Sequence, residues 1–140
     1  MQLVFGQDEQ VASFVGLQLG MKFARPFVAI GVEVGGDLKG GAVYNQWNGW
    51  NIEVSIYGPG LASREIIKAL IWGYPFNDIG AGRLTARTRR ANKVVQKLLP
   101  RLGFTFEGMN KRYYGPARAD DAMVFHLMRE QAEGLYNGDR

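Results

Sequence analysis

The chain has 140 residues, of which 46% are hydrophobic and 12% aromatic, and this composition predicts one globular domain with a core of its own. It contains no cysteine and a single histidine, which excludes disulfides and thiolate chemistry, so we expect no metal site. The net charge of +4 favours anionic partners without naming one.

The N-terminus, Met1-Gln2-Leu3, has no basic region ahead of an apolar stretch, so no signal peptide is expected. No run approaches the roughly 18 apolar residues that a membrane span requires. These two observations predict a cytoplasmic protein that has no membrane partner.

The first half of the chain alternates strands with turns. Asp8 is expected to cap a helix that ends near Leu19, and a strand is expected from Phe27 to Val34. A second strand passes through Val43 and Tyr44 and meets Asn48-Gly49, a pair typical of hairpins.

The next strand, Asn51 to Tyr57, alternates apolar and polar side chains along its length. The turn Gly58-Pro59-Gly60 follows it and leads into a helix expected from Ser63 to Tyr74. This region therefore predicts a strand, a glycine-rich turn and a helix in direct succession.

The second half supplies a short strand, a helix and two further strands. The strands are expected at Arg83 to Arg87, Phe104 to Tyr114 and Ala122 to Arg129. The segment 131–140 is polar and is predicted to be a loose tail. This order predicts an α+β fold in a single domain, 1–140, with a mixed sheet.

The block from Asn92 to Gly108 carries the most specific pattern. Apolar residues recur at three- and four-residue spacing after Asn92, and Gly103-Phe104 and then Glu107-Gly108 close the block. Asn92 lies where a helix begins and Gly103 where a left-handed cap is needed. This block resembles the fourth helix and sixth strand of the GNAT superfamily of N-acetyltransferases. An ordinary helix with a glycine stop is the alternative.

The resemblance extends over almost the whole chain. It implies the GNAT fold: a mixed, mostly antiparallel, twisted sheet that is flanked by helices and has splayed parallel fourth and fifth strands. The N-terminal part is short for that fold. Within the superfamily the chain is most similar to small GNAT-like proteins of tailed bacteriophages, through Tyr74-Pro75-Phe76, Ile79-Gly80 and Met128-Arg129-Glu130.

The resemblance also implies acetyl-CoA as co-substrate. The family's phosphate-binding loop falls on residues 57–62, where Gly60 and Ala62 match and Tyr57 replaces a polar or basic residue. Small residues suit that place because backbone N–H groups must approach a pyrophosphate at a helix N-terminus. The alternative is a plain turn capped by Ser63. The residues predicted to hold the cofactor are Ser55, Ile56, Tyr57, Gly58, Gly60, Leu61, Ala62, Ser63, Arg64 and Asn92.

Acyl transfer to an amine requires a base, an oxyanion donor and an acid. Glu53 is the predicted general base, and the alternative is a structural carboxylate paired with an arginine. Many GNAT members carry a tyrosine acid seven residues after the asparagine, but that position is Leu99 here. Tyr57, Tyr113 or Tyr114 could replace it.

Many basic residues fall between positions 83 and 101. A solvated helix face is one interpretation, and contact with cofactor phosphates is another. Nucleic acid is disfavoured because no aromatic residues are interleaved there. His126 is alone on a late strand, and we expect it to be a core or edge residue whose ring nitrogens have hydrogen-bond partners.

Two functions follow from these patterns. The first is an acetyl-CoA-dependent N-acetyltransferase acting on an amine, with a protein of an infected bacterium as acceptor. The second is a phage-encoded binding module that keeps the GNAT scaffold, engages a host protein and has weak or no catalysis. The sequence is also compatible with a homodimer.

Overall fold

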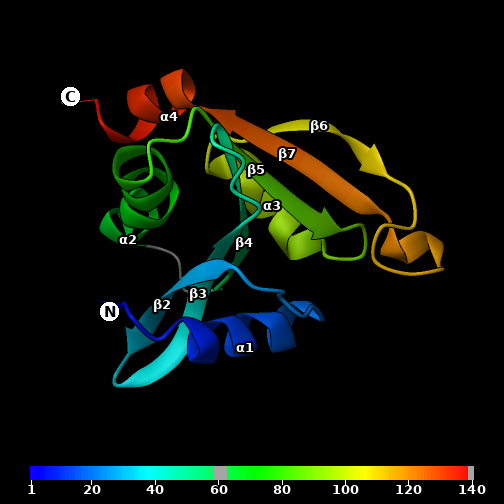
Figure 1. Cartoon of the computed structure of the whole chain (residues 1–140), viewed down its shortest axis with the longest axis horizontal. Helices are drawn as coiled ribbons and strands as arrows, with labels where there is room; N and C mark the ends of the chain where they lie inside the picture. The colour runs from blue at the N-terminus through cyan, green and yellow to red at the C-terminus, as the bar shows by residue number, and fades with distance from the viewer. Residues whose placement is uncertain (59–62, 139–140) are drawn as a thin grey trace.

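The computed structural model of the chain describes residues 1–58 and 63–138, which form a seven-stranded sheet with helices on both faces (Figure 1). The strands are β1 (Gln2–Val4), β2 (Phe27–Val34), β3 (Asp37–Asn45), β4 (Asn51–Tyr57), β5 (Arg83–Arg89), β6 (Thr105–Asn110) and β7 (Ala122–Met128). The helices are α1 (Asp8–Leu19), α2 (Arg64–Lys68), α3 (Lys93–Arg101) and α4 (Arg129–Tyr136). A π-helical segment, Ala69–Asp78, continues α2, and a 3₁₀ turn, Arg118–Asp120, precedes β7.

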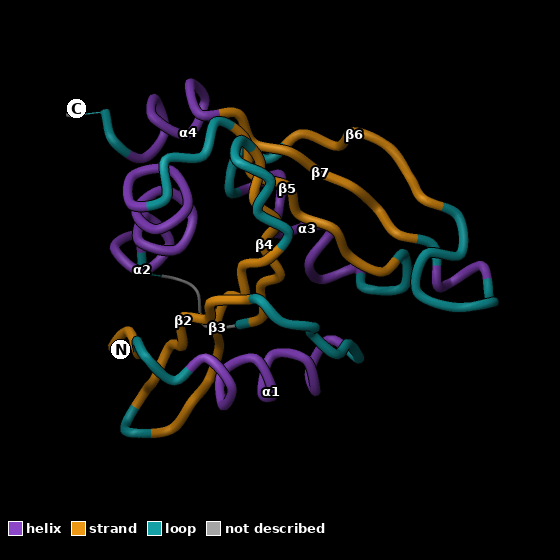
Figure 2. The backbone as a smooth tube through the Cα atoms, in the orientation of Figure 1, coloured by secondary structure: helices purple, strands orange, loops and turns teal. Residues whose placement is uncertain are grey.

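The strands lie in the order β1-β2-β3-β4-β5-β7-β6. Only β4 and β5 pair in parallel among the described strands, and each of the other pairs is antiparallel (Figure 2). The crossover between the two parallel strands contains α2 and the π-helical segment. The predicted mixed, mostly antiparallel sheet is confirmed.

The parallel strands separate at their C-terminal ends. Their pairing runs from Asn51 opposite Arg83 to Val54 opposite Ala86, and it stops there. Both strands nevertheless continue for three more residues, to the ends of β4 and β5. Beyond this point each strand keeps its other neighbour, β3 or β7. The predicted splay is therefore confirmed, and it opens a gap inside the sheet.

Side chains alternate between the two faces of the sheet, and the two faces are covered differently. On one face, Leu70 and Leu99 pack from the π-helical segment and α3 onto buried strand residues such as Leu84. On the opposite face, α1 places Val15 against Val43. In Figure 1, α1 lies along β2 and β3, and its contacts extend to β4. The face that it covers is left without a described helix over β5, β7 and β6.

The prediction of a loose tail over residues 131–140 is wrong for most of that segment. Residues up to Tyr136 form α4, in which Ala132 and Tyr136 are buried. The Tyr136 hydroxyl donates a hydrogen bond to the carbonyl of Leu102. The apolar side of this helix is short and interrupted by glycine, so its stability comes from packing on the body of the protein, which composition does not reveal.

Three helix starts were predicted from capping residues: Asp8, Ser63 and Asn92. Ser63 does cap α2, since its hydroxyl accepts a hydrogen bond from the N–H of Ile66 at 3.4 Å. Asp8 begins α1 but does not cap it: its carboxylate accepts from the N–H of Ala29 at 3.1 Å and so ties the helix to β2. Among the described helices, none is both long enough and apolar enough to cross a membrane.

Candidate active site

The gap between β4 and β5 forms the inner part of a narrow cleft. Its walls come from both strands, from α3 on one face, and from the end of α1 and the residues after it on the other. The lining residues are Leu19, Met21, Val54, Ser55, Ile56, Ala86, Arg87, Thr88, Arg89, Asn92, Val95 and Leu99. Most of these side chains are apolar, Arg87 and Arg89 add positive charge, and the enclosed cavity is narrow, with a volume of about 10 Å³.

The cleft continues outward between the end of β4 and the first turns of α3. This outer part is lined by Tyr57, Gly58 and Asn92, together with Val94 and Gln18. The inner and outer parts share lining residues from β4, β5 and α3, so they form one continuous groove. The groove opens beside Gly58, where the first described segment of the chain ends.

The structure brings several predicted cofactor residues together in this groove. Ser55 and Ile56 line its inner part, and Tyr57, Gly58 and Asn92 line its outer part. The predicted loop residues Gly60, Leu61 and Ala62 lie outside the described residues.

The other two predicted cofactor residues follow that loop. Ser63 caps α2, as described above. The guanidinium of Arg64 donates to the carbonyl of Leu135 in α4 at 3.0 Å, and Arg64 is not among the residues that line the groove. Arg64 therefore joins two helices rather than facing the groove.

Asn92 combines a structural contact with a place in the groove. Its side-chain oxygen accepts a hydrogen bond from the N–H of Val95 at 3.2 Å, so it caps α3 as predicted. The side-chain NH₂ group carries no hydrogen bond within residues 1–58 and 63–138. It remains available to a bound molecule because Asn92 lines both parts of the groove.

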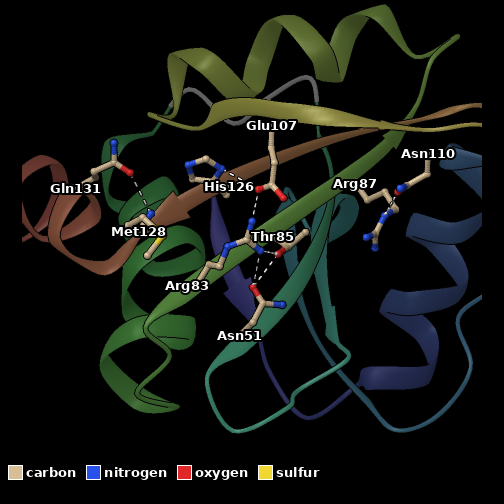
Figure 3. Close-up of polar contacts among 9 residues, drawn as sticks. All are labelled: Asn51, Arg83, Thr85, Arg87, Glu107, Asn110, His126, Met128 and Gln131. Atoms are coloured by element: carbon tan, nitrogen blue, oxygen red, sulfur yellow. Dashed lines mark hydrogen bonds and ion pairs between the residues drawn. The ribbon is translucent and has the colours of Figure 1, made fainter.

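The predicted base, Glu53, lies on β4 immediately before the strands separate. Its carboxylate pairs with the guanidinium of Arg87 on β5, and both side chains are largely buried. Burial opposes the charge of Arg87, but Glu53 more than offsets this, so the pKa of Arg87 is raised above its ordinary value. Arg87 also donates from Nε to the side-chain oxygen of Asn110 at 3.2 Å (Figure 3).

Tyr113 and Tyr114 lie over the same face of the sheet. The guanidinium of Arg87 lies 4.8 Å from the ring centre of Tyr113, and that of Arg89 lies 4.8 Å from that of Tyr114. Burial, and then the charge of Glu53, raise the pKa of the Tyr114 hydroxyl above its ordinary value. The hydroxyl therefore stays protonated and can act as a donor.

A second polar network occupies the uncovered face farther from the groove. Glu107 on β6 pairs with Arg83, and it also contacts Nδ1 of His126 at 2.9 Å. Arg83 and the hydroxyl of Thr85 both donate to the side-chain oxygen of Asn51. In Figure 3 these side chains point toward one another from four neighbouring strands. His126 thus has a polar partner, in agreement with a satisfied histidine.

The sequence interpretation missed the role of the arginines on β5. They were treated as part of a basic stretch with a solvated helix face, but Arg83, Arg87 and Arg89 all point to one face of a strand. Each pairs with a carboxylate: Glu107, Glu53 and Asp120, respectively. Their alternate spacing was a visible sign of a strand face, but the acidic partners are distant in sequence and could not be assigned.

Comparison with protein-family models and with curated proteins finds no match. Solved structures do match. The first is a mutant of spermidine N-acetyltransferase SpeG from Vibrio cholerae, with a TM-score of 0.71 and 14% identity over 94% of this chain and 97% of that chain. A ribosomal-protein-alanine N-acetyltransferase from Brucella melitensis gives a TM-score of 0.65 and 13% identity over 91% and 99% of the two chains.

A third structure is YncA from Salmonella typhimurium, described as a putative acetyltransferase with its cofactor acetyl-CoA. Its TM-score is 0.63 and its identity 15%, over 92% of this chain and 94% of that one. At such identities the likeness shows the fold alone. With its separated parallel strands and the groove between them, the chain has the fold of the GNAT acetyltransferases.

Proposed function

We propose that the protein is an N-acetyltransferase that moves an acetyl group from acetyl-CoA to an amine. The observation that carries this proposal is the separation of β4 from β5 after Val54 and Ala86, which opens a groove between α1 and α3. A thioester held there would lie beside the backbone of two strands and below the start of α3.

On this proposal, the parts of acetyl-CoA lie along the groove in order. The thin pantetheine arm suits the apolar inner part, and the free NH₂ group of Asn92 can donate to one of its amide carbonyls. The pyrophosphate would meet the backbone at Gly60 and Ala62, where small residues permit close approach. The positive end of the helix that follows favours this negative charge.

The transfer forms a C–N bond and breaks the C–S bond of the thioester. Glu53 accepts the proton of the attacking amine, directly or through water, and a backbone N–H at the end of β4 donates to the oxyanion. Leu99 is buried in the groove wall and has no proton to give to the leaving thiolate. The acid is proposed to be Tyr57, which lines the outer part of the groove, or Tyr113 or Tyr114, which lie over the face that carries Glu53.

The acceptor is proposed to be an amine on a protein rather than a polyamine. A polyamine requires free carboxylates, but Glu53, Glu107 and Asp120, on the face that leads to the groove, are each paired with an arginine. The narrower resemblance to small phage proteins points to a protein in the cytoplasm of an infected bacterium. A homodimer remains a prediction, which sedimentation velocity would test.

Two observations favour the second candidate, a binding module with the same scaffold. Glu53 is held by Arg87, which suits a structural carboxylate as well as a base, and Leu99 replaces the usual tyrosine acid. On this alternative the protein engages a host protein through its surface and turns over slowly or not at all.

Calorimetric titration with acetyl-CoA tests the proposal. Wild type should bind acetyl-CoA, whereas Gly60→Val should not, because a branched side chain blocks the approach of backbone to phosphate. Gly60→Ala should lie between the two, and circular dichroism should show all three proteins folded. Equal affinity in wild type and Gly60→Val would refute the phosphate assignment. Absence of acetyl-CoA binding by wild type would refute the transferase and favour the binding module.

A further inference from the structure

A basic depression lies at the end of the sheet where β6 turns into β7. It is lined by Arg90, Met109, Lys111, Arg112, Arg118 and Asp121. In Figure 1 this connection projects beyond the other elements, at the end of the sheet opposite α4. Lys111, Arg112 and Arg118 are exposed, so the depression presents their charges to solvent.

The carboxylates of this region are already engaged. Asp121 is buried, accepts the backbone N–H of Arg112 at 2.8 Å, and pairs with Arg90 at 3.2 Å. The bond from the Arg112 N–H, followed by the contact with Arg90, lowers the pKa of Asp121 below its ordinary value, so it stays ionised. Asp120 pairs with Arg89. Within the described part of the chain, the side chains of Lys111, Arg112 and Arg118 have no carboxylate partner.

The connection is held in one conformation by its own hydrogen bonds. Tyr114 N–H donates to the carbonyl of Asp120 at 3.0 Å, and Arg90 N–H donates to that of Asp121 at 2.8 Å. The carboxylate of Asp120 also accepts from the N–H of Ala117 at 3.0 Å. Because the backbone is fixed before binding, less conformational entropy is lost when a partner arrives.

The depression and the groove between β4 and β5 both lie near the C-terminal end of β5. Arg89 lines the groove, and Arg90 beside it lines the depression. Tyr113 and Tyr114 follow Lys111 and Arg112 in the connection between β6 and β7, and they stack on Arg87 and Arg89, which line the groove. The connection that carries the three cations therefore contacts the end of β5 that lines the groove, which is close enough for residues beside an acceptor amine to reach it.

We propose that this basic depression binds acidic side chains that flank the acetylated amine of a protein acceptor. The inference rests on the proposed function and names the chemistry of its acceptor. Guanidinium groups bind carboxylates through paired hydrogen bonds. Nucleic acid is disfavoured because no aromatic side chain lines the depression, whereas sites for single strands stack bases on aromatic rings.

The test uses two fluorescein-labelled peptides with a central lysine, one flanked by glutamates and the other by glutamines. Anisotropy without acetyl-CoA should show that wild type binds the glutamate peptide at least about tenfold more tightly. The double variant Arg112→Gln/Arg118→Gln should lose this preference. The matched control Lys97→Gln/Arg101→Gln removes the same charge from the exposed side of α3 and should keep the preference.

Equal affinity of wild type for the two peptides would overturn the inference, as would tighter binding of a labelled DNA strand of the same length. Loss of the preference in the α3 control would also overturn it, since net charge alone would then explain the binding. Acetylation of both peptides is measured separately. A glutamate preference without acetylation would support the docking site for acidic residues and refute the transferase. Acetylation without the preference would support the transferase and refute the docking site.

Discussion

The carboxylate of Glu53 on β4 is paired with the guanidinium of Arg87 on β5, at the point where the two strands separate. Arg87 also contacts Asn110 on β6 and stacks on Tyr113, so a single side chain joins the splayed strands to the far edge of the sheet. This places a charged, structurally restrained pair at the inner end of the groove. Whether Glu53 acts as a base can be separated from its role in this pair.

Glu53→Gln should lower turnover by roughly 10²-fold, as loss of a positioned base does, and should remove the acidic limb of the pH–rate profile. The affinity for acetyl-CoA should stay unchanged because the carboxylate does not face the phosphates. Glu107→Gln is the matched control, since it removes the same charge from an arginine pair on the same face. Unchanged turnover with a lower melting temperature in Glu53→Gln would assign the residue a structural role only.

Asn92→Ala and Asn92→Ser separate helix capping from ligand binding. The alanine variant should lose about 1 kcal/mol of stability in urea because it removes the hydrogen bond to the N–H of Val95, and serine should retain most of it. Both variants should bind acetyl-CoA more weakly in calorimetry, since both lack the free NH₂ group. If Asn92→Ser bound as tightly as wild type, the asparagine would be a cap and nothing more.

Gly40→Ala should disturb the groove without touching a bound ligand. A Cβ atom at this position on β3 would lie 2.7 Å from the carbonyl oxygen of Tyr57 and 3.0 Å from Cα of Gly58, both backbone atoms. The end of β4 must therefore shift, and we expect a lower melting temperature and weaker acetyl-CoA binding. Gly108→Ala, where nothing lies within 4 Å of the new atom, should change neither by much and serves as the control.

The contribution of Tyr44 to stability should be constant up to about pH 10, the ordinary pKa of tyrosine, and should fall above it. Burial, and then the neighbouring Tyr74, raise the pKa of Tyr44 well above that value. In alkaline solution the unfolded chain therefore loses a proton that the folded chain keeps, which favours unfolding. The expected slope is about −1.4 kcal/mol per pH unit from this group.

Urea titrations at a series of alkaline pH values would measure this slope. Tyr44→Phe should make the slope less steep by about 1.4 kcal/mol per pH unit while removing only the hydrogen bond to the carbonyl of Leu70 at 2.6 Å, and Tyr114, whose pKa is also raised, should account for part of the slope that remains. A slope that is identical in the variant would show that Tyr44 does not control alkaline unfolding.

Local patterns were sufficient for most of the fold. The alternation in 51–57, the cap at Asn92 and the glycine stop at Gly103 each predicted a boundary correctly, because the physics that sets them involves near neighbours. Gly103 has a φ of 101°, as the predicted left-handed cap requires. The separation of β4 from β5 was available only through the family resemblance, since spacing within one strand says nothing about where its neighbour stops.

The walls of the groove were much less predictable. Leu19 and Met21 line it because the end of α1 turns over β4, a tertiary arrangement that carries no local pattern. The pairing of Glu53 with Arg87 was foreseen only as one alternative, without a named partner. α4 was missed for the same reason: Tyr136 is anchored to Leu102, which is distant in sequence.

The separation of β4 and β5 also bears on self-association. Where two strands separate, their facing backbone N–H and C=O groups are left unpaired. At the outer edge of a sheet, unpaired groups of this kind allow another chain to add a strand. Here the unpaired groups lie inside the sheet, where Leu19 and Met21 cover them on one face and Val95 and Leu99 cover them on the other. The cavity between these walls has a volume of only about 10 Å³, so no strand of another chain pairs with β4 or β5 there. The covering side chains thus keep the unpaired margins of the two strands from acting as a template for aggregation.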